Sequence, residues 1–372
     1  MESNELKYGF TTGSAACASA KAALNYLITG IKSDVSIETP SGIIYTPKVY
    51  DYFIERLSPE TINIGDYAGC YVIKESGDDP DITAGIKIFS KVTINGDNEI
   101  IITGAKGIGR VTRKGLDQNI GEYAINSVPR KMIKDALTKL LYEHCINMGV
   151  TVEISAPEGE EIAKKTFNPH MGIEGGISII GTSGIVRPMS TEALIDTIKL
   201  DINIKYNEGM KKCIIAPGNY GVTFLKNNYG IEEKDIVLCS NFVSDAMKLA
   251  VDRGFTKILF CSHIGKMIKV SGGVLNTHSM YGDRRMEFMS DALSEAVTDN
   301  DNVDMDFLKE KIKNCISTTE ALNVIEPYGL IKRVSKVIVD KTKNRLEEVC
   351  NNKATVDVIL YENSYGELAK SF

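Results

Sequence analysis

Residues 236–263, IVLCSNFVSDAMKLAVDRGFTKILFCSH, decide the fold class of this chain. An apolar run, Ile236–Cys239, is followed by an amphipathic segment, Phe242–Arg253, and by a second apolar run, Lys257–Cys261. Nearly all-apolar strands that alternate with helices are typical of a parallel sheet covered on both faces. We therefore expect a strand, a helix and a strand here, arranged as in α/β proteins.

The alternation continues toward the N-terminus. The sequence predicts an earlier strand over Ile177–Ile180, a helix from about Ser190, a strand over Cys213–Ala216 and a helix near Gly221–Asn228. Beyond about residue 300 the pattern is weaker and predicts a helical segment with one late strand, Thr355–Tyr361. The second half is therefore expected to hold a mostly parallel sheet with a helical C-terminal part.

The first half has a different order of predicted helices and strands. It begins with a predicted helix, Thr11–Ile28, which Gly30 can end, and it closes with a long amphipathic helix, Val128–Met148, and a strand, Thr151–Ser155. Between the helices lie short β-branched segments bounded by turn residues: Val35–Thr39, Ile43–Val49, Cys70–Lys74, Ile86–Ile94 and Glu99–Thr103. We expect an α+β domain over residues 1–160 and an α/β domain over residues 161–372.

The bulk composition limits the class of protein. A chain of 372 residues usually forms two domains, and a net charge of −6 argues against a nucleic-acid partner. The eight cysteines are scattered without a Cys-x-x-Cys pair, which indicates reduced thiols rather than disulfides or a zinc site. No apolar run is long enough to span a membrane, and Glu2 and Glu5 stand where a secretion signal has basic residues. We expect a cytoplasmic protein with no membrane partner.

Small or polar residues follow each expected strand of the second half: Gly181-Thr182-Ser183-Gly184, Pro217-Gly218-Asn219, Ser240-Asn241 and Ser262-His263. In an open parallel sheet the carboxyl ends of the strands line one crevice, where ligands bind. Four successive strands that end in this way indicate a nucleotide-like ligand. Ordinary turns between strands and helices also use Gly and Asn, so the pattern alone leaves both interpretations open.

The densest polar cluster, residues 263–287, follows the last of these strands. It contains two of the chain's four histidines, His263 and His278, together with lysines, arginines and Asp283. Histidine transfers protons near neutral pH, so we expect the stretch to line the crevice and act on a ligand rather than form a plain loop. A zinc site would need further ligands at the right spacing, so no metal site is expected here.

A basic, Gly-rich segment in the first half, residues 104–115, carries four basic residues and no acids directly after a strand. Arg130 follows at a helix start. Arginine forks match carboxylates and helix N-termini favour negative charge, so these residues indicate an anion-binding lobe, with a solvated basic loop as the alternative. The helix entry Thr11–Ser14 can hold an anion similarly or simply cap its helix. The acidic turn Ser76–Asp81 can bind a hard cation but more often such a turn caps backbone amides.

Taken together and in order, these segments resemble the cobalt-precorrin-5B methyltransferase family of anaerobic cobalamin biosynthesis (the CbiD type). The resemblance runs from residue 8 to about residue 290 and rests on these segments: Tyr8–Ser14, Gly77–Asp81, Gly107–Gly115, Ala124–Met132, Asn168–Ser190, Pro217–Gly221 and His263–Glu287. Two positions depart from the family pattern. Ala15 stands where the family commonly has Cys, so a role for that thiol does not carry over, and Ser127 replaces the usual Pro.

The resemblance implies an S-adenosylmethionine-dependent C-methyltransferase that adds a methyl group to carbon 1 of cobalt-precorrin-5B and gives cobalt-precorrin-6A. It implies S-adenosylmethionine as the methyl donor and an acidic tetrapyrrole as the substrate, with cobalt only as part of that substrate. It also implies an α+β first domain and a Rossmann-like second domain. Methyl transfer from a sulfonium to carbon is an in-line displacement, for which the protein mainly supplies orientation and a desolvated site.

On this basis the crevice residues are expected to hold the donor: Gly181, Thr182, Ser183, Gly184, Pro217, Gly218, Asn219 and Asn241. The substrate is expected to contact a second, mostly basic set: Thr11, Thr12, Ser14, Arg110, Arg113, Arg130, Arg187, Lys266, Lys269, Asn276, Thr277, Arg284 and Arg285. We expect His263, His278 or Asp283 either to manage the proton balance that follows methylation or to hydrogen-bond the ligand. No metal ligands are expected.

Two other functions stay open. A nucleotide-dependent oxidoreductase of the same pathway would also use Gly-rich strand ends, although Gly-Thr-Ser-Gly is not the Gly-x-Gly-x-x-Gly of dinucleotide-binding folds. A non-catalytic tetrapyrrole carrier would need the basic residues but no donor crevice. The sequence also leaves the oligomeric state open, a homo-oligomer included.

Overall fold

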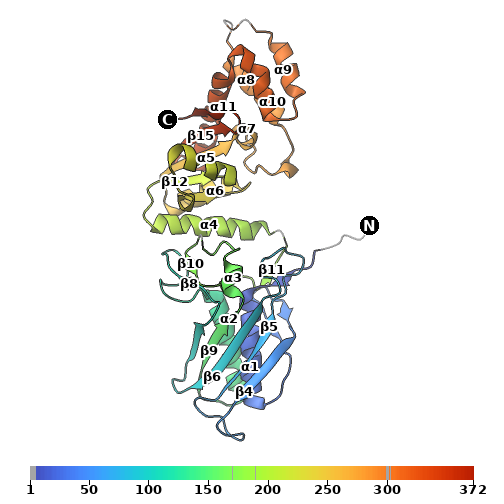
Figure 1. Ribbon diagram of the computed structural model, residues 1–372, viewed down its shortest axis with the longest axis vertical. Helices are drawn as coiled ribbons and strands as arrows, with labels where there is room; N and C mark the ends of the chain where they lie inside the picture. Colours follow the sequence, from blue (N-terminus) through green and yellow to red (C-terminus); the bar gives the residue numbers. More distant parts are fainter. Residues whose placement is uncertain (1–5, 170, 189, 299–300, 302) are drawn as a thin grey trace, which may run out of the picture. The chain divides into compact units, whose positions relative to one another are not determined.

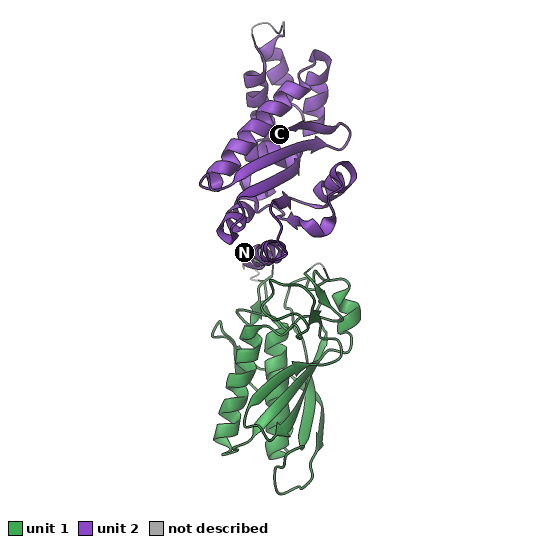
Figure 2. Ribbon diagram, turned by 90° about the vertical axis from the view of Figure 1, so that its left-hand side faces the viewer, with its two compact units in different colours: residues 1–191 green, residues 192–372 purple. Residues whose placement is uncertain are grey.

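Two compact units make up the chain. The computed structural model describes residues 6–169, 171–188, 190–298, 301 and 303–372. The first unit ends at Thr191 and the second begins at Glu192 (Figure 2). The boundary expected at residue 160 lies inside the first unit, because residues 173–186 contribute two short strands that pair within it.

The first unit is built from these elements, in chain order: β1 (Gly9–Phe10), α1 (Thr12–Thr29), β2 (Ile37–Glu38), β3 (Ile44–Tyr45), β4 (Val49–Glu55), β5 (Tyr67–Ile73), β6 (Lys87–Asn95), β7 (Ile100–Gly104), β8 (Arg110–Val111), α2 (Ser127–Glu143), β9 (Gly149–Ser155), α3 (Gly159–Ala163), β10 (Ile173–Glu174) and β11 (Ile185–Val186). Its main sheet has the order β4-β5-β6-β9-β7 and is antiparallel except between β9 and β7. Helices α1 and α2 pack against each other, and α1 lies on β5 and β6 (Figure 1). This is the α+β arrangement that the sequence predicts.

Helix α1 begins and ends at residues that favour those positions. The side chain of Thr11 accepts a hydrogen bond from the N–H of Ser14, and Gly30 ends the helix in the left-handed conformation. Most of the helix is buried, and most of its buried residues are alanine or similarly small. Such short side chains let α1 lie close to the sheet, whose strand β6 alternates buried and half-buried residues.

Strand β4 is the main difference from the prediction in this unit. The segment predicted as one strand, Ile43–Val49, is divided between β3 and the first residue of β4, and the rest of β4 was not predicted. The register of β4 against β5 shifts between Tyr50 and Phe53, and Asp51 has a φ of 50°. Such a bulge interrupts the period-two alternation by which a strand is found in a sequence.

The predicted strand Ile177–Ile180 does not belong to the parallel sheet. Ile177 and Ile179 each form a single bridge within the first unit, to Ile108 and to Ile125. Both side chains are buried in the core of that unit. The prediction was wrong because an apolar run does not reveal which distant segment it pairs with.

The second unit is built from these elements, in chain order: α4 (Thr191–Asn207), β12 (Cys213–Ala216), α5 (Asn219–Tyr229), η1 (Glu233–Asp235), β13 (Ile236–Leu238), α6 (Val243–Arg253), β14 (Lys257–His263), α7 (Ile264–Ser271), η2 (Ser279–Tyr281), α8 (Arg285–Ala296), α9 (Met305–Lys313), α10 (Thr318–Ile325), η3 (Glu326–Tyr328), α11 (Ile331–Val349), β15 (Thr355–Glu362) and β16 (Gly366–Lys370). Its sheet has the order β13-β12-β14-β15-β16; the first four strands are parallel and β16 is antiparallel. Helix α5 packs on one face, and α6, α7 and α11 belong to the core on the other face (Figure 1). This unit has the predicted α/β arrangement.

The order of the strands creates a topological switch point. The chain leaves β12 for β13 on one side and then returns to β14 on the other side of β12. The connections after β12 and β14 therefore diverge at the carboxyl ends of these two strands. In open α/β sheets this is the place where ligands bind.

The C-terminal part adds two strands to the sheet. The late strand predicted at Thr355–Tyr361 is β15, whose residues Thr355–Tyr361 pair with all of β14. Neither its place in the sheet nor the antiparallel strand β16 was predicted. Helices α9 to α11 form the helical part predicted beyond residue 300, whereas α8 was not predicted. Within the part of the chain that the structure describes, no helix is long and apolar enough to cross a membrane.

Candidate functional site

Polar residues gather where the four parallel strands of the second unit end, a region that we call the carboxyl edge. It is formed by Pro217–Asn219 after β12, Ser240–Asn241 after β13, His263 at the end of β14 and Glu362 at the end of β15. Three of these strand ends were predicted to lie together. The fourth comes from the C-terminal strand and was missed.

The loop after β12 is open. Gly218 caps α5 with an extended backbone, and a Cβ added there would meet no atom within 4 Å. Asn219 is exposed in the first turn of α5, where the free N–H groups of a helix favour electronegative ligand atoms. A Cβ at Gly221, in contrast, would lie 3.0 Å from the Cβ of Ala216. Helix α5 thus starts directly against the end of β12 and leaves space on its solvent side.

His263 joins the ends of β14 and β15. Its Nδ1 accepts a hydrogen bond from the N–H of Gly265 (3.0 Å), and its Nε2 lies 3.8 Å from Oε1 of Glu362. The ring stands edge-on to Tyr361, with 5.6 Å between the ring centroids. Burial lowers the pKa of His263, against the opposing effect of the Glu362 carboxylate. The imidazole is therefore neutral near pH 7, with its proton on Nε2.

Glu362 is a candidate that the sequence analysis did not find. Its side chain is buried, and its carboxylate accepts hydrogen bonds from the hydroxyl of Thr319 (3.1 Å) and from the N–H groups of Ser364 (2.6 Å) and Tyr365 (3.1 Å). These donors fix the orientation of the carboxylate. The available signal was the polar run Tyr361–Ser364, which follows an apolar strand just as the other strand ends do.

Two lysines of α7 reach the loop after β13. Nζ of Lys266 donates to the carbonyl oxygen of Ser240 (3.2 Å), and Nζ of Lys269 donates to that of Thr277 (3.3 Å). Thr277 bonds Asn241 twice: its N–H donates to the backbone oxygen and its hydroxyl donates to Oδ1, both at 3.0 Å. The structure therefore brings together four residues that were predicted for the site.

The segment after Thr277 is held by local contacts. Oδ1 of Asn276 accepts a hydrogen bond from the N–H of His278 (3.1 Å), and Nδ1 of His278 accepts one from the N–H of Met280 (3.2 Å). Asn276 also forms a β-bridge with Phe242, directly after the loop that follows β13. His278 is exposed, and like His263 it uses Nδ1 to cap a helical turn.

The charged residues that end the polar stretch pair with one another. Arg285 donates from Nε (2.8 Å) and from its terminal nitrogen (2.6 Å) to Asp283, and Arg284 binds Glu287 in the same forked way. The hydrogen bonds from Arg285 lower the pKa of Asp283 to about 2. Asp283 is therefore ionised and a weak proton acceptor near pH 7. A ligand carboxylate would have to displace an existing partner from each arginine.

The turn Gly181–Gly184, predicted to bind the donor, lies in the first unit and closes the N-terminus of α1. The carbonyl oxygen of Ile180 accepts from the N–H of Gly13 (3.0 Å), and that of Gly184 accepts from the hydroxyl of Ser14 (2.6 Å). A Cβ at Gly181 would lie 2.3 Å from Oγ1 of Thr11, and its φ is +138°. The expectation that this turn ends a strand of the parallel sheet was wrong.

The three hydroxyls predicted to bind substrate at the same helix entry all bond to the protein. Thr11 caps α1, Thr12 donates to the carbonyl oxygen of Ser178 (3.1 Å), and Ser14 donates to that of Gly184. All three side chains are buried. The capping interpretation of this motif accounts for its hydroxyls without a ligand.

Two arginines near the basic segment also bond to the backbone. Arg130 donates to the carbonyl oxygens of Ile125 and Ile102, both at 2.8 Å, and thereby ties α2 to β7. Arg110 donates to the carbonyl oxygen of Gly121 (2.6 Å) and lies 3.8 Å over the ring of Tyr123. Arg130 is thus a structural residue, whereas Arg110 is exposed and stacked.

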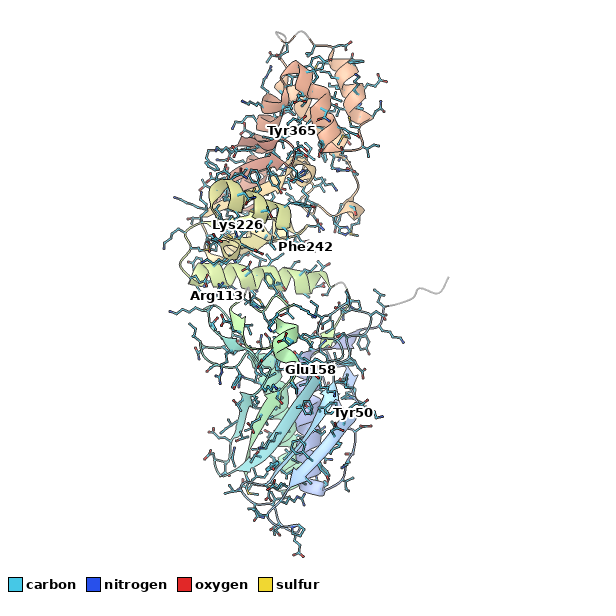
Figure 3. The ribbon with its side chains drawn as sticks, in the orientation of Figure 1. Tyr50, Arg113, Glu158, Lys226, Phe242 and Tyr365 are labelled. Carbon is cyan, nitrogen blue, oxygen red and sulfur yellow. The ribbon has the colours of Figure 1, made fainter. Side chains whose placement is uncertain are left out.

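The other two predicted arginines of the first unit lie elsewhere in it. Arg113 packs against Gly172, where an added Cβ would be 2.4 Å from its Cγ (Figure 3). Arg187 is exposed, directly after β11.

The acidic turn Ser76–Asp81 encloses a lysine. Nζ of Lys74, which is buried, donates to the hydroxyl of Ser76 (2.6 Å) and to Oδ2 of Asp81 (2.5 Å). The ammonium group thus stands where a bound cation would need to be. Among the described residues, no group of three or more His, Cys, Asp or Glu is placed to hold a metal ion.

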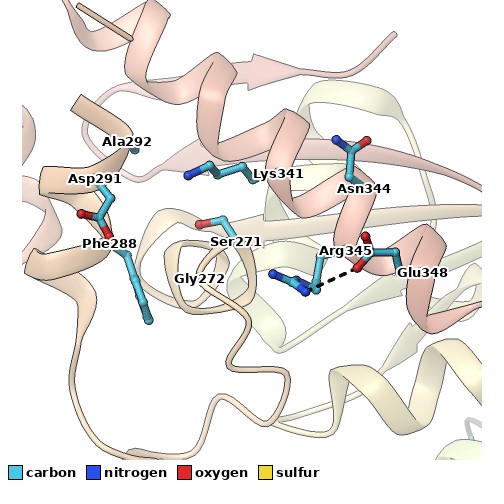
Figure 4. A pocket seen from close by; sticks show the side chains of 9 residues that line it. All are labelled: Ser271, Gly272, Phe288, Asp291, Ala292, Lys341, Asn344, Arg345 and Glu348. Atoms are coloured by element: carbon cyan, nitrogen blue, oxygen red, sulfur yellow. Dashed lines mark hydrogen bonds and ion pairs between the residues drawn. The ribbon is translucent and has the colours of Figure 1, made fainter. Parts of the chain in front are cut away.

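A pocket of about 340 Å³ lies at the other end of α7 (Figure 4). Ser271 and Gly272, at the C-terminus of that helix, line it together with residues of α8 and α11, among them the ion pair Arg345–Glu348. The eight residues of α7 span about 10 Å, which separates this pocket from the carboxyl edge. Ser271 and Gly272 belong to the polar stretch 263–287, but none of the residues predicted individually to bind donor or substrate lines this pocket.

Comparisons with known proteins identify the family. The family model described as CbiD matches residues 1–188, and the one described as CbiD, C-terminal domain, matches residues 276–372. A relative from Thermoanaerobacter sp. (strain X514), named cobalt-precorrin-5B C(1)-methyltransferase, is 40% identical over 373 residues, which cover 100% of this chain and 96% of the relative. A relative of the same name from Ruminiclostridium cellulolyticum is 41% identical over 369 residues, which cover 98% of this chain and 91% of the relative.

A crystal structure of the cobalamin biosynthesis protein CbiD from Archaeoglobus fulgidus is also similar. It is 24% identical, with a TM-score of 0.37, over 75% of this chain and 84% of the other. The family resemblance predicted from the sequence is confirmed by the family models and by the full-length relatives. The chain belongs to the CbiD family.

Proposed function

We propose that this chain is a C-methyltransferase that adds a methyl group to carbon 1 of cobalt-precorrin-5B in cobalamin biosynthesis. The observation that carries the proposal is the match at 40% identity, over essentially the whole chain, to a relative named for that reaction. Cobalt enters the reaction as part of the substrate. A methyltransferase needs a methyl donor, and we assign that role to S-adenosylmethionine, with cobalt-precorrin-6A as the product.

The carboxyl edge supports donor binding. The second unit has a switch point between β12 and β14, and ligands of open, doubly wound sheets bind at such a point, which supports the assignment. The open loop Pro217–Asn219 and the side chain of Asn241 lie at the ends of β12 and β13. We assign the nucleoside part of the donor to these two loops. Gly181–Gly184 are left out of the assignment, because their carbonyl groups cap α1.

The acidic substrate needs cationic partners for its carboxylates. We assign this role first to Arg284 and Arg285, which lie on the exposed segment after Thr277 and hold carboxylates already. A substrate carboxylate can replace Glu287 or Asp283 as the partner, since both ion pairs are local and accessible. In the first unit the exposed guanidinium groups of Arg110 and Arg187 suit the same purpose. Arg130 is left out, because it binds two backbone carbonyls.

The two histidines fit the role of hydrogen-bond donors better than that of bases. Each accepts a backbone hydrogen bond at Nδ1, which leaves Nε2 as the protonated nitrogen of the neutral ring. A neutral imidazole in this tautomer donates from Nε2 and has no free lone pair for a substrate proton. Orientation of donor and substrate in a desolvated site would then supply most of the rate enhancement.

Anaerobic incubation with cobalt-precorrin-5B and S-adenosylmethionine, labelled in its methyl group, tests the proposal. The expected result is one labelled methyl group on the tetrapyrrole. Intact substrate binding without methyl transfer would select the non-catalytic carrier instead. Binding of NADH, with no binding of S-adenosylmethionine, would favour the oxidoreductase.

A further inference from the structure

Two lysines at the carboxyl edge are removed from solvent without a carboxylate partner. Lys269 is 8% exposed and Lys266 is half-buried. Among the described residues, neither takes part in an ion pair, although most neighbouring charges do. The polar contacts of their ammonium groups are single carbonyl oxygens at 3.2 and 3.3 Å. Burial of an ammonium group costs free energy unless an opposite charge lies beside it. We therefore expect an anion to bind these two lysines.

The titratable groups nearby do not supply that anion. Burial raises the pKa of the Cys239 thiol to about 12, so the thiol is neutral. Asp283 is influenced by the charge of Lys269, but its carboxylate is already bound by Arg285. Burial also lowers the pKa of Lys266, as expected for a cation that lacks a counter-charge.

The position of the lysines connects them to the loops assigned to the donor. Lys266 follows β14 and reaches Ser240 after β13, and these two strands flank β12 in the sheet. Its side chain therefore spans the carboxyl end of β12, where the open loop Pro217–Asn219 begins. Lys269 binds Thr277, which is bonded twice to Asn241. Lys266 thus borders the switch point, and Lys269 is linked to the loop after β13 through Thr277, while its charge also acts on Asp283.

We propose that Lys266 and Lys269 bind the carboxylate of the amino-acid part of the methyl donor. This inference rests on the proposed function and adds the part of the donor that these residues recognise. S-adenosylmethionine carries one carboxylate and no phosphate, so a buried site with two cations and no carboxylate suits a single, invariant anionic group. The many carboxylates of a tetrapyrrole are spread around its rim and fit accessible partners such as Arg284.

Calorimetric binding of two nucleosides tests this assignment. S-adenosylhomocysteine has the carboxylate, whereas 5′-methylthioadenosine shares the thioether and nucleoside but lacks it. In Lys266→Met and Lys269→Met the affinity for S-adenosylhomocysteine should fall by about 10- to 100-fold, the range for loss of a hydrogen-bonded charge, while the affinity for 5′-methylthioadenosine stays within about twofold. Lys248→Met, at an exposed lysine of α6, should change neither affinity.

Three other results would overturn the assignment. An equal loss for both nucleosides would mean that the lysines only shape the loops, and no loss for either would mean that they bind something else. Absence of S-adenosylhomocysteine binding to the unsubstituted protein would remove the donor assignment of the proposed function as well. Lys266 is only half-buried, so its variant keeps the test valid if Lys269→Met fails to fold.

Discussion

Two regions of the molecule look alike in sequence and differ in what their polar atoms do. The N-terminus of α1, with the turn Gly181–Gly184, and the carboxyl edge of the second unit both combine Gly, Ser, Thr and Asn at the start of helices. At α1 the hydroxyls and amides bond to backbone groups of residues 178–184. At the carboxyl edge, among the described residues, two ammonium groups lack a carboxylate partner and the loop at Gly218 is open. A Gly-rich polar motif therefore marks a site only where the fold leaves its polar groups unpaired.

The largest effect is expected from a pair of glycine substitutions, one in each region. Gly181→Val should lower the free energy of unfolding by about 3 kcal/mol, because its Cβ would overlap Thr11 and its φ of +138° is unfavourable for a β-branched residue. Gly218→Ala should leave stability unchanged, since its backbone is extended and its Cβ would meet no atom, but it should weaken donor binding. Chemical denaturation and donor titration of both variants measure the contrast; the reverse pattern would refute it.

Removal of a single hydroxyl at α1 should have a smaller effect. Ser14→Ala should cost about 1–2 kcal/mol of unfolding free energy, the range for loss of a buried hydrogen bond, because its hydroxyl donates to Gly184. Donor and substrate affinities of the folded protein should not change. A variant of normal stability that no longer binds the substrate would show that the hydroxyl contacts a ligand after all.

Glu362→Gln tests the buried carboxylate of the carboxyl edge. The negative charge of Glu362 favours the protonated ring of His263, so its removal should move the His263 midpoint in an NMR titration further below the ordinary value of 6.5. Below pH 6.5 the unfolded chain binds a proton at His263 that the folded chain does not bind. The free energy of unfolding therefore decreases as pH falls below 6.5, and the decrease should be larger in Glu362→Gln. Glu367→Gln, at an exposed position of β16, is the matched control. A midpoint that rises or stays in place would separate Glu362 from His263.

The smallest effect is expected from an exposed arginine. Arg284→Ala should leave unfolding unchanged, because its pairing with Glu287 is local and solvent-exposed. The KM for cobalt-precorrin-5B should rise several-fold with little change in kcat, as expected when uniform substrate binding is lost. Lys336→Ala, at an exposed position of α11, is a suitable control. Unaltered substrate affinity in Arg284→Ala, and likewise in Arg110→Ala, would contradict the carboxylate assignment.

Local signals in the sequence predicted the elements of the fold well. Gly30 ends α1 as predicted, and the strand Cys213–Ala216 was predicted with its observed bounds, because helix ends and apolar runs depend on neighbouring residues. The loops at Asn241 and His263 were likewise predicted to lie at one edge. These features follow from chain order in a parallel sheet.

Long-range pairing set the limit of the prediction. The segment Ile177–Ile180 was predicted as a strand of the parallel sheet. Instead, Ile177 and Ile179 form β-bridges with Ile108 and Ile125 in the first unit. The place beside β14 is taken by β15, which lies far along the chain and brings Glu362 to His263. An apolar run indicates that a segment will be buried, but it does not indicate with which other segment it will pair. That is why the predicted site contained a turn from the wrong unit and lacked its buried carboxylate.

Hydrogen exchange with and without S-adenosylhomocysteine shows directly where the donor binds. If it binds at the carboxyl edge, exchange should slow at the backbone amides of residues 216–221, 240–242 and 263–269 and should not change at residues 11–15 and 178–184. Slower exchange at the α1 entry and at Gly181–Gly184, with none at the carboxyl edge, would contradict it.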